Sequence, residues 1–236
     1  MTEETPEIVP AATAGADVPP DHLSVNPRSP FFDAEKLQRG VGIRFKDRVR
    51  TDIEEYSITE GWGPTGSERF FPGKGYINRG ISGQTTAQML VRFSQDVLAL
   101  RPNVVVILAG TNDIAGNTGP ATQAMIEDNL QAMLDLAKAH GVAVVLASVL
   151  PVSEYPWMPG ITPAPKVRAL NAALKRHADA RGLVYLDYYA AMANRAGGLD
   201  AQLATDGVHP TAKGYALMAP LAEAAIKRAQ ANAPKR

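Results

Sequence analysis

VVVILAG, residues 104–110, is a short continuous run of apolar residues that ends in a glycine. A second run of the same kind, VAVVLASVL, occupies residues 142–150. Strands that are buried on both faces read as continuous Val, Ile and Leu, whereas strands with one solvated face alternate between apolar and polar residues. The two runs therefore predict central strands of a parallel sheet that is covered on both faces.

Helical patterns surround the two runs. Apolar residues recur at helical spacing in four segments, residues 85–100, 121–141, 164–182 and 211–230. Glycines at 141 and 182 close the second and third segments, as expected for helix ends. Shorter strand candidates lie at residues 76–80 and 183–187. Strands that alternate with amphipathic helices predict an α/β fold.

Composition predicts one medium-sized domain that follows an irregular N-terminus. The chain has 236 residues, of which 45% are hydrophobic. Residues 1–30 hold six of the 18 prolines and five acidic side chains against one arginine, so we expect a disordered acidic tail there. The short alternating pieces GIRF and RVRT, residues 42–45 and 48–51, predict a small hairpin.

Several classes of function lack their usual sequence signals. The net charge is zero and no Lys/Arg-rich run occurs, so we expect no nucleic-acid partner. The chain has no cysteine, no HExxH motif and no GxGxxG motif, and we expect no cofactor and no metal. The N-terminus lacks a signal-peptide pattern and no apolar run is long enough to cross a membrane, which together predict a cytoplasmic protein, with an exported ancestor possible. The oligomeric state is left open.

Four polar loops follow the predicted strands or precede the last helix. They are NRGISGQTT, AGTNDIAGN, PVSEYPWMPG and DGVHP, which begin at residues 78, 109, 151 and 206. Taken singly, each fits an ordinary turn. Ligands of parallel α/β sheets bind beyond the carboxyl ends of the strands, where these loops would meet. Their joint occurrence predicts an active site at that edge.

The residue types in these loops suit nucleophilic catalysis by a serine. A serine hydroxyl needs a neighbouring imidazole to take its proton, and that imidazole needs a carboxylate on its other nitrogen. Asp206 and His209, three residues apart, can supply this pair, with Pro210 favouring an extended His209 and Thr211 capping the last helix. The side-chain amide of Asn112 suits the stabilisation of an oxyanion.

These blocks resemble the SGNH or GDSL-type family of esterases and acylhydrolases from about residue 57 onward. The matching blocks are SITEGW with Ser57, NRGISGQTT with Gly80, GTND with Asn112, and DGVHP with Asp206 and His209. The resemblance implies a three-layer α/β/α sandwich with a flavodoxin-like sheet in residues 57–230. It also implies a serine esterase with Ser57 as nucleophile and His209 as general base. The oxyanion hole would consist of the Ser57 and Gly80 N–H groups and the Asn112 amide.

The first block departs from the family pattern. Glu55, Tyr56 and Ser57 stand where the family has Gly-Asp-Ser, and Asp52 and Glu54 precede them. A central strand covered on both faces is expected to be apolar, and burying one unpaired carboxylate costs several kcal/mol. We therefore expect that residues 51–56 do not form a normal central strand.

A second resemblance concerns residues 22–62, which look like a short uncharacterised bacterial protein family that is unrelated to hydrolases. The two resemblances predict a chimaera joined inside SITEGW, with residues 31–56 as an atypical N-terminal segment. Three alternatives follow. Ser57 is the nucleophile of an active esterase, it is a loop residue of an inactive ligand-binding relic, or residues 22–62 form an interaction module.

Aromatic residues are the candidates for substrate binding. Trp62, Tyr155 and Trp157 are expected at the rim of the site, where they could contact a sugar or an acyl chain, although loop packing is an equal alternative. The resemblance implies a small ester substrate with a short acyl chain or an acetylated carbohydrate. Among rivals for catalytic roles, Ser82 lacks the GxSxG context, and His140 and His177 fall on helical patterns.

Overall fold

The computed structural model of the protein describes residues 51–54, 56–62 and 73–233, with side chains from Ile58 onward. Within that part lies one parallel sheet of five strands in the order β2-β1-β3-β4-β5. The strands are β1 (Thr51–Glu54), β2 (Tyr76–Asn78), β3 (Val104–Ile107), β4 (Ala143–Ala147) and β5 (Val184–Leu186). This is the strand order of flavodoxin-like folds, so the predicted fold class is confirmed.

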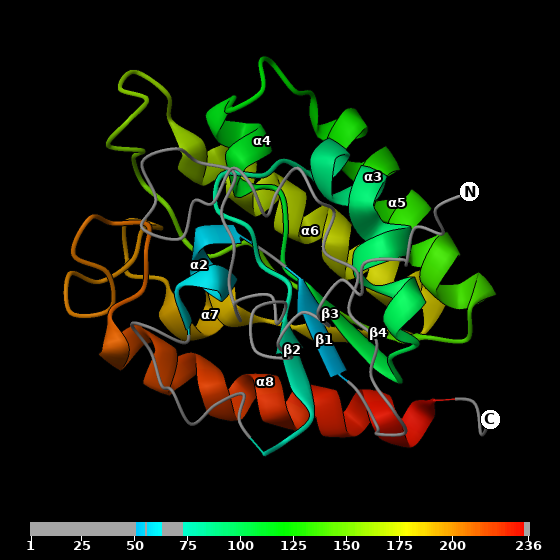
Figure 1. Ribbon diagram of the computed structural model, residues 1–236. Coiled ribbons are helices and arrows are strands. Elements are labelled where there is room, and N and C mark those ends of the chain that lie inside the picture. Colours follow the sequence, from blue (N-terminus) through cyan, green and yellow to red (C-terminus); the bar gives the residue numbers. More distant parts are fainter. Residues whose placement is uncertain (1–50, 55, 63–72, 234–236) are drawn as a thin grey trace, which may run out of the picture.

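Helices cover both faces of the sheet and make three layers (Figure 1). One layer contains α3 (Thr86–Asp96), α5 (Gln123–Ala139) and α6 (Pro163–Arg181), and α8 (Ala212–Asn232) runs along the opposite face. Shorter helices are α2 (Tyr56–Glu60), α4 (Thr111–Ala115), α7 (Tyr188–Met192) and the 3₁₀ turn η2 (Leu98–Leu100). No helix in the described ranges combines the length and apolar character needed to cross a membrane.

The ends of the helices agree with the local signals in the sequence. Thr211 precedes α8, and its hydroxyl accepts a hydrogen bond from the Gly214 N–H at 3.3 Å, as predicted for a cap. Gly182 ends α6 with φ of +64°, a left-handed conformation that glycine adopts without strain. The predicted helix over residues 85–100 divides in two, because α3 ends at Asp96 and η2 follows it.

The core lies between the sheet and its helices. All four residues of β3 and four of the five in β4 are buried, which confirms the interpretation of the two apolar runs. Met89 and Phe93 of α3 are fully buried, as is Met133 of α5. Burial of each such side chain contributes about 1.5–3 kcal/mol, so this core holds the loops at the strand ends in fixed positions.

The expectation that residues 51–56 do not form a normal central strand is wrong for residues 51–54. Residues Thr51–Glu54 form β1, which pairs in parallel with β2 on one side and with β3 on the other; Ile53 lies opposite both Asn78 and Val106. The ladder consists of backbone N–H and C=O groups, so an acidic sequence can join it. The expectation depended on the absence of an apolar pattern. Such a pattern indicates whether side chains are buried, not whether the backbone pairs with neighbouring strands.

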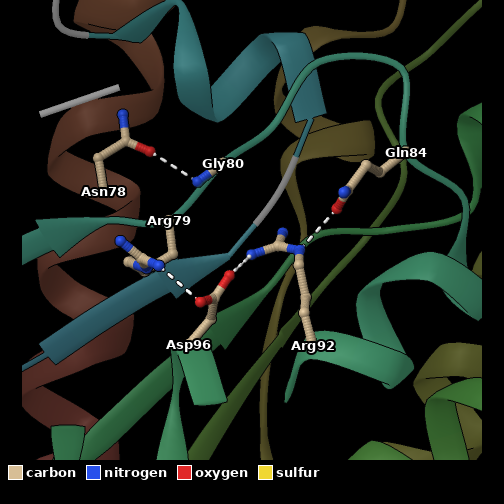
Figure 2. A network of polar contacts seen from close by, with 6 residues as sticks. All are labelled: Asn78, Arg79, Gly80, Gln84, Arg92 and Asp96. Carbon is tan, nitrogen blue, oxygen red and sulfur yellow. Dashed lines mark hydrogen bonds and ion pairs between the residues drawn. The ribbon is translucent and has the colours of Figure 1, made fainter. Parts of the chain in front are cut away.

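A partly buried cluster of charged side chains follows β2. Arg79 directly follows β2, the neighbour of β1, and shares Asp96 with Arg92 of α3 (Figure 2). Both guanidinium groups are largely buried. Among the described side chains of this cluster, two cations therefore accompany one carboxylate.

The predicted tail, residues 1–30, lies outside the described residues. The same is true of the predicted hairpin except for Thr51, its last residue, which belongs to the parallel strand β1. The sheet thus takes one of its inner strands from the segment, residues 31–56, that we assigned to an atypical N-terminus.

Candidate active site

The candidate residues gather at the carboxyl edge of the sheet. Ser57 is the second residue of α2, the helix that follows β1, and Asn112 lies in α4, which follows β3. Gly80 follows β2. Because β1 and β3 are neighbours while the chain leaves them in different directions, this edge is the topological switch point at which flavodoxin-like sheets bind ligands.

Asp206 and His209 form a hydrogen-bonded pair in the loop before α8. The Asp206 Oδ2 atom lies 2.5 Å from His209 Nδ1. Its other oxygen accepts the backbone N–H groups of Val208 at 2.9 Å and of His209 at 2.7 Å. The carboxylate therefore holds both the imidazole and the turn that carries it. The proton on Nδ1 then directs proton acceptance to Nε2.

These hydrogen bonds keep the Asp206 carboxyl group ionised. Partial burial by itself raises the pKa of the Asp206 carboxyl. Hydrogen bonds from the His209 ring and from the His209 and Val208 N–H groups outweigh burial and hold the pKa well below its usual range. The ionised carboxylate thus holds the imidazole in one orientation and tautomer, as a general base requires.

Trp157 is the one predicted aromatic residue that reaches the rim of the site. Its side chain is 42% exposed, and its ring lies 5.8 Å from the His209 ring between centroids, at an interplanar angle of 34°. The indole thus lies against one side of the imidazole. An exposed aromatic ring beside the proposed base is well placed to contact a substrate.

The structure does not place Trp62 and Tyr155 at the rim. Both are 1% exposed or less, Trp62 against Tyr215 of α8 and Tyr155 beneath Trp157. The Tyr155 hydroxyl donates to the Thr111 carbonyl at 2.9 Å and lies 2.6 Å from the Thr111 hydroxyl. These two side chains pack in the interior. The sequence predicted that they would be exposed, but α8 covers Trp62 and Trp157 covers Tyr155.

A pocket of about 420 Å³ adjoins the pair, which is within the usual range for small-molecule sites. It is bordered by Gly61, at the end of α2, and by the loop and first turn of α8. The lining residues are Gly61, Thr205, Asp206, His209, Pro210, Thr211, Ala212 and Tyr215. The end of the helix that carries Ser57 and the proposed base thus share one cavity.

The expected oxyanion donors are held by neighbouring groups. The Gly80 N–H donates to Asn78 Oδ1 at 2.9 Å (Figure 2). The Asn112 amide nitrogen donates to the Gln84 carbonyl at 3.0 Å, and this nitrogen carries two N–H groups. Both donors lie in or against the loop that joins β2 to α3, residues 79–85. The Asn112 contact aims the amide, while the Gly80 contact occupies an N–H that the family resemblance assigns to the oxyanion.

A network of polar side chains fixes Gln84 of this loop. The Gln84 Oε1 atom accepts from Arg92 Nε at 2.6 Å, and Arg92 in turn contacts Asp96 at 2.8 Å (Figure 2). Gln84 is therefore fixed at both its side chain and its backbone. Its backbone carbonyl accepts the Asn112 amide, so the network supports the residue that orients that amide.

Asp113, the neighbour of Asn112, attaches the same loop to α4. Its carboxylate accepts the Thr86 N–H at 3.0 and 3.2 Å and the Thr86 hydroxyl at 2.6 Å. Burial raises the pKa of the Asp113 carboxyl, and the hydrogen bonds from Thr86 act against that rise. The first turn of α3 is thereby held to the helix that carries Asn112.

Sequence reasoning missed four side chains that organise this site, namely Glu60, Asn78, Gln84 and Tyr215. Three of them stand inside the recognised blocks, Glu60 in SITEGW and the other two in NRGISGQTT. Polar side chains inside the recognised blocks were the available signal. Tyr215 had no such signal, since it reads as one apolar position of α8.

The two rival histidines have other contacts, while the rival Ser82 donates its backbone N–H to Glu60 Oε2 at 2.5 Å. His177 Nε2 lies 2.8 Å from Glu127 Oε2 and links α6 to α5, and His140 Nδ1 lies 2.9 Å from the Leu136 carbonyl at the end of α5. Neither histidine lies at the carboxyl edge beside Ser57. Across the described part of the chain, no group of three or more acidic or histidine side chains could hold a metal.

Comparison with known families gives two overlapping matches. Residues 57–217, more than half of the chain, match the GDSL-like Lipase/Acylhydrolase family. Residues 20–69 match a family described as a protein of unknown function (DUF3297). The uncharacterised lipoprotein YqeF of Bacillus subtilis is 33% identical over 81 residues; the match spans about a third of this chain and a third of that relative.

Solved structures agree with the first match. A candidate acylhydrolase of Bacteroides fragilis is 40% identical with a TM-score of 0.76, over 84% of this chain and 95% of the other. A GDSL-like lipase of Bacteroides thetaiotaomicron is 41% identical with a TM-score of 0.76, over 83% and 97%. An acetylxylan esterase of Geobacillus stearothermophilus, 19% identical with a TM-score of 0.61 over 79% and 96%, shares the fold. With the flavodoxin-like sheet and the Asp206–His209 pair, these matches place the chain in the GDSL-like lipase/acylhydrolase family of hydrolases.

Proposed function

We propose that the protein is a serine esterase that cleaves small carboxylic esters through Ser57, His209 and Asp206. The observation that carries the proposal is the Asp206–His209 pair, 2.5 Å between Oδ2 and Nδ1, in a pocket that is also bordered by the end of the Ser57 helix. A base and its orienting carboxylate beside a serine-bearing helix are the parts that acyl transfer needs.

In this mechanism His209 Nε2 takes the proton of the Ser57 hydroxyl as the oxygen attacks the ester carbonyl. The resulting imidazolium returns the proton to the leaving alcohol, and an acyl-enzyme remains. Water, activated by the same imidazole, then releases the carboxylic acid and regenerates Ser57. Asp206 stays ionised throughout, because its hydrogen bonds hold its pKa low.

The developing oxyanion would be met by the Ser57 N–H, the Gly80 N–H and the Asn112 amide. Asn112 is already aimed by its contact with the Gln84 carbonyl. For Gly80 to contribute, its N–H must shift from Asn78 Oδ1 or be shared between two acceptors. The Asn112 donor is worth about 2.7–4 kcal/mol in comparable sites.

The pocket favours a short acyl chain or an acetyl group. Its volume of about 420 Å³ and its mixed lining suit a small ester rather than a long lipid. The exposed Trp157 ring offers a flat apolar surface on which a sugar or a small alcohol could lie.

A catalytically impaired relic is the second candidate. The occupied Gly80 N–H favours it, since an oxyanion donor with a protein acceptor at 2.9 Å stabilises negative charge less. An altered block before Ser57 favours it as well.

Labelling with a fluorophosphonate and hydrolysis of p-nitrophenyl acetate separate the two candidates. An esterase takes up one label per chain, Ser57→Ala removes both labelling and turnover, and Ser82→Ala, the matched control, keeps them. His209→Ala should abolish turnover in protein that still folds. Two results would contradict the proposal: folded wild-type protein that takes no label, or labelling that Ser82→Ala removes and Ser57→Ala keeps.

A further inference from the structure

The helix that carries Ser57 is too short to hold itself in place. α2 has five residues, Tyr56–Glu60, and isolated helices below about 12–15 residues are marginal in water. The last four carbonyls of any helix also lack partners within the helix. The position of Ser57 must therefore come from contacts that other elements make with α2.

Tyr215 of α8 makes one of these contacts. Its side chain is 2% exposed, and its hydroxyl donates to the Ile58 carbonyl at 2.6 Å. Ile58 is the residue next to Ser57, and Tyr215 lies on the helix that directly follows the His209 loop. One hydrogen bond thus ties the backbone beside the proposed nucleophile to the element beside the proposed base.

Asn78 makes the second contact and reaches in two directions. Its Nδ2 donates to the Thr59 carbonyl at 2.5 Å, and its Oδ1 accepts the Gly80 N–H at 2.9 Å. A single amide therefore spans α2 and the loop that contains the expected oxyanion donor. It satisfies a second terminal carbonyl of α2.

Glu60 makes the third contact from α2 itself. Its side chain is buried, and its Oε2 accepts the Ser82 N–H at 2.5 Å. The carboxylate therefore joins the end of α2 to the same loop, two residues beyond Gly80.

We propose that Tyr215, Asn78 and Glu60 form a three-point clamp of positioning residues, which sets the spacing of Ser57 from His209 and from Gly80. The three contacts bind α2 to two segments that carry other proposed catalytic groups, namely the region of the His209 loop and the loop that contains Gly80. The inference deepens the proposed esterase function and, for its effect on rate, rests on it.

Tyr215→Phe is the sharpest test, because it removes one hydroxyl and keeps the ring that packs against Trp62. Tyr185→Phe is the matched control, since the Tyr185 hydroxyl also donates to a backbone carbonyl, that of Asn171 of α6 at 3.3 Å. Two readouts are measured on the full chain. The first is activity, given by the rate of fluorophosphonate labelling and by kcat and KM for p-nitrophenyl acetate. The second is amide hydrogen exchange in residues 56–61.

The clamp predicts that Tyr215→Phe slows labelling and lowers kcat by about tenfold to hundredfold, because small misplacements of a reacting group have effects of that size. In the same variant KM should stay the same and amide exchange in α2 should accelerate. Tyr185→Phe should change none of these quantities. Equal labelling and equal α2 exchange in the two variants would overturn the clamp. If wild-type protein takes no label, the esterase function fails, and the exchange data alone decide whether the clamp holds α2.

Asn78→Ala provides an independent variant. The clamp predicts slower labelling and faster exchange in α2, because the Thr59 carbonyl loses its donor. If Asn78 instead restrains catalysis by occupying the Gly80 N–H, the variant would label faster than wild type, and the assignment of Asn78 as a positioning residue would be wrong.

Discussion

Tyr155→Phe should destabilise the protein without changing its affinity for substrate. The Tyr155 hydroxyl is buried and donates to the Thr111 carbonyl at 2.9 Å, so the Thr111 hydroxyl, 2.6 Å away, must donate to it. Burial raises the pKa of Tyr155 to about 12, which keeps the hydroxyl protonated and able to donate. The variant removes one hydroxyl oxygen and leaves the ring in place.

The size of the effect follows from the groups that lose a partner. Thr111 is 4% exposed, so water does not readily replace the lost donor to its carbonyl. An unsatisfied buried polar group costs about 1–3 kcal/mol. In a chain of this size each kcal/mol lowers Tm by about 2–4 °C, so the expected decrease in Tm is about 2–12 °C.

The measurement is thermal unfolding together with KM for p-nitrophenyl acetate, with Trp157→Ala as the comparison. Trp157 lies beside His209 and is 42% exposed, so its removal should raise KM. Tyr155→Phe should lower Tm and leave KM unchanged. A higher KM with an unchanged Tm in Tyr155→Phe would show that this residue contacts substrate, and the packing argument would be refuted.

The other two predictions concern the catalytic groups. Asn112→Ala should lower kcat by about 10²–10³ with a smaller effect on KM, because an oxyanion contact strengthens in the transition state; steady-state kinetics would reveal a ground-state role if KM alone changed. Asp206→Asn should lower Tm most above about pH 4, the ordinary carboxyl value. The pKa of Asp206 is lowered in the folded state, so its stabilisation is present above that pH and is lost in acid. A Tm difference that stays constant down to acid pH would contradict this assignment.

Local patterns were sufficient for much of the fold. The apolar runs at β3 and β4 became buried central strands, because continuous Val, Ile and Leu can be satisfied only in a sheet covered on both faces. The pairing of Asp206 with His209 was also predictable, since the two side chains are three residues apart in one turn.

Non-local contacts decided the rest. β1 joins the sheet although its sequence is acidic, because the pairing depends on backbone groups supplied by β2 and β3. Trp62 and Tyr155 are buried rather than exposed, since α8 and the Trp157 loop cover them. Whether an aromatic ring lies at a rim or in a core depends on its neighbours in space, which a loop sequence does not contain.

The sequence by itself determined the family, the α/β architecture and the Asp206–His209 pair, because each follows from residue types and short spacings along the chain. Only the tertiary structure decided how the Ser57 helix is held. Tyr215 and Ile58 are 157 residues apart in sequence, yet their hydrogen bond joins α8 to α2. Contacts of that separation depend on how the sheet orders its strands and how the helices pack on it, and no local pattern encodes them.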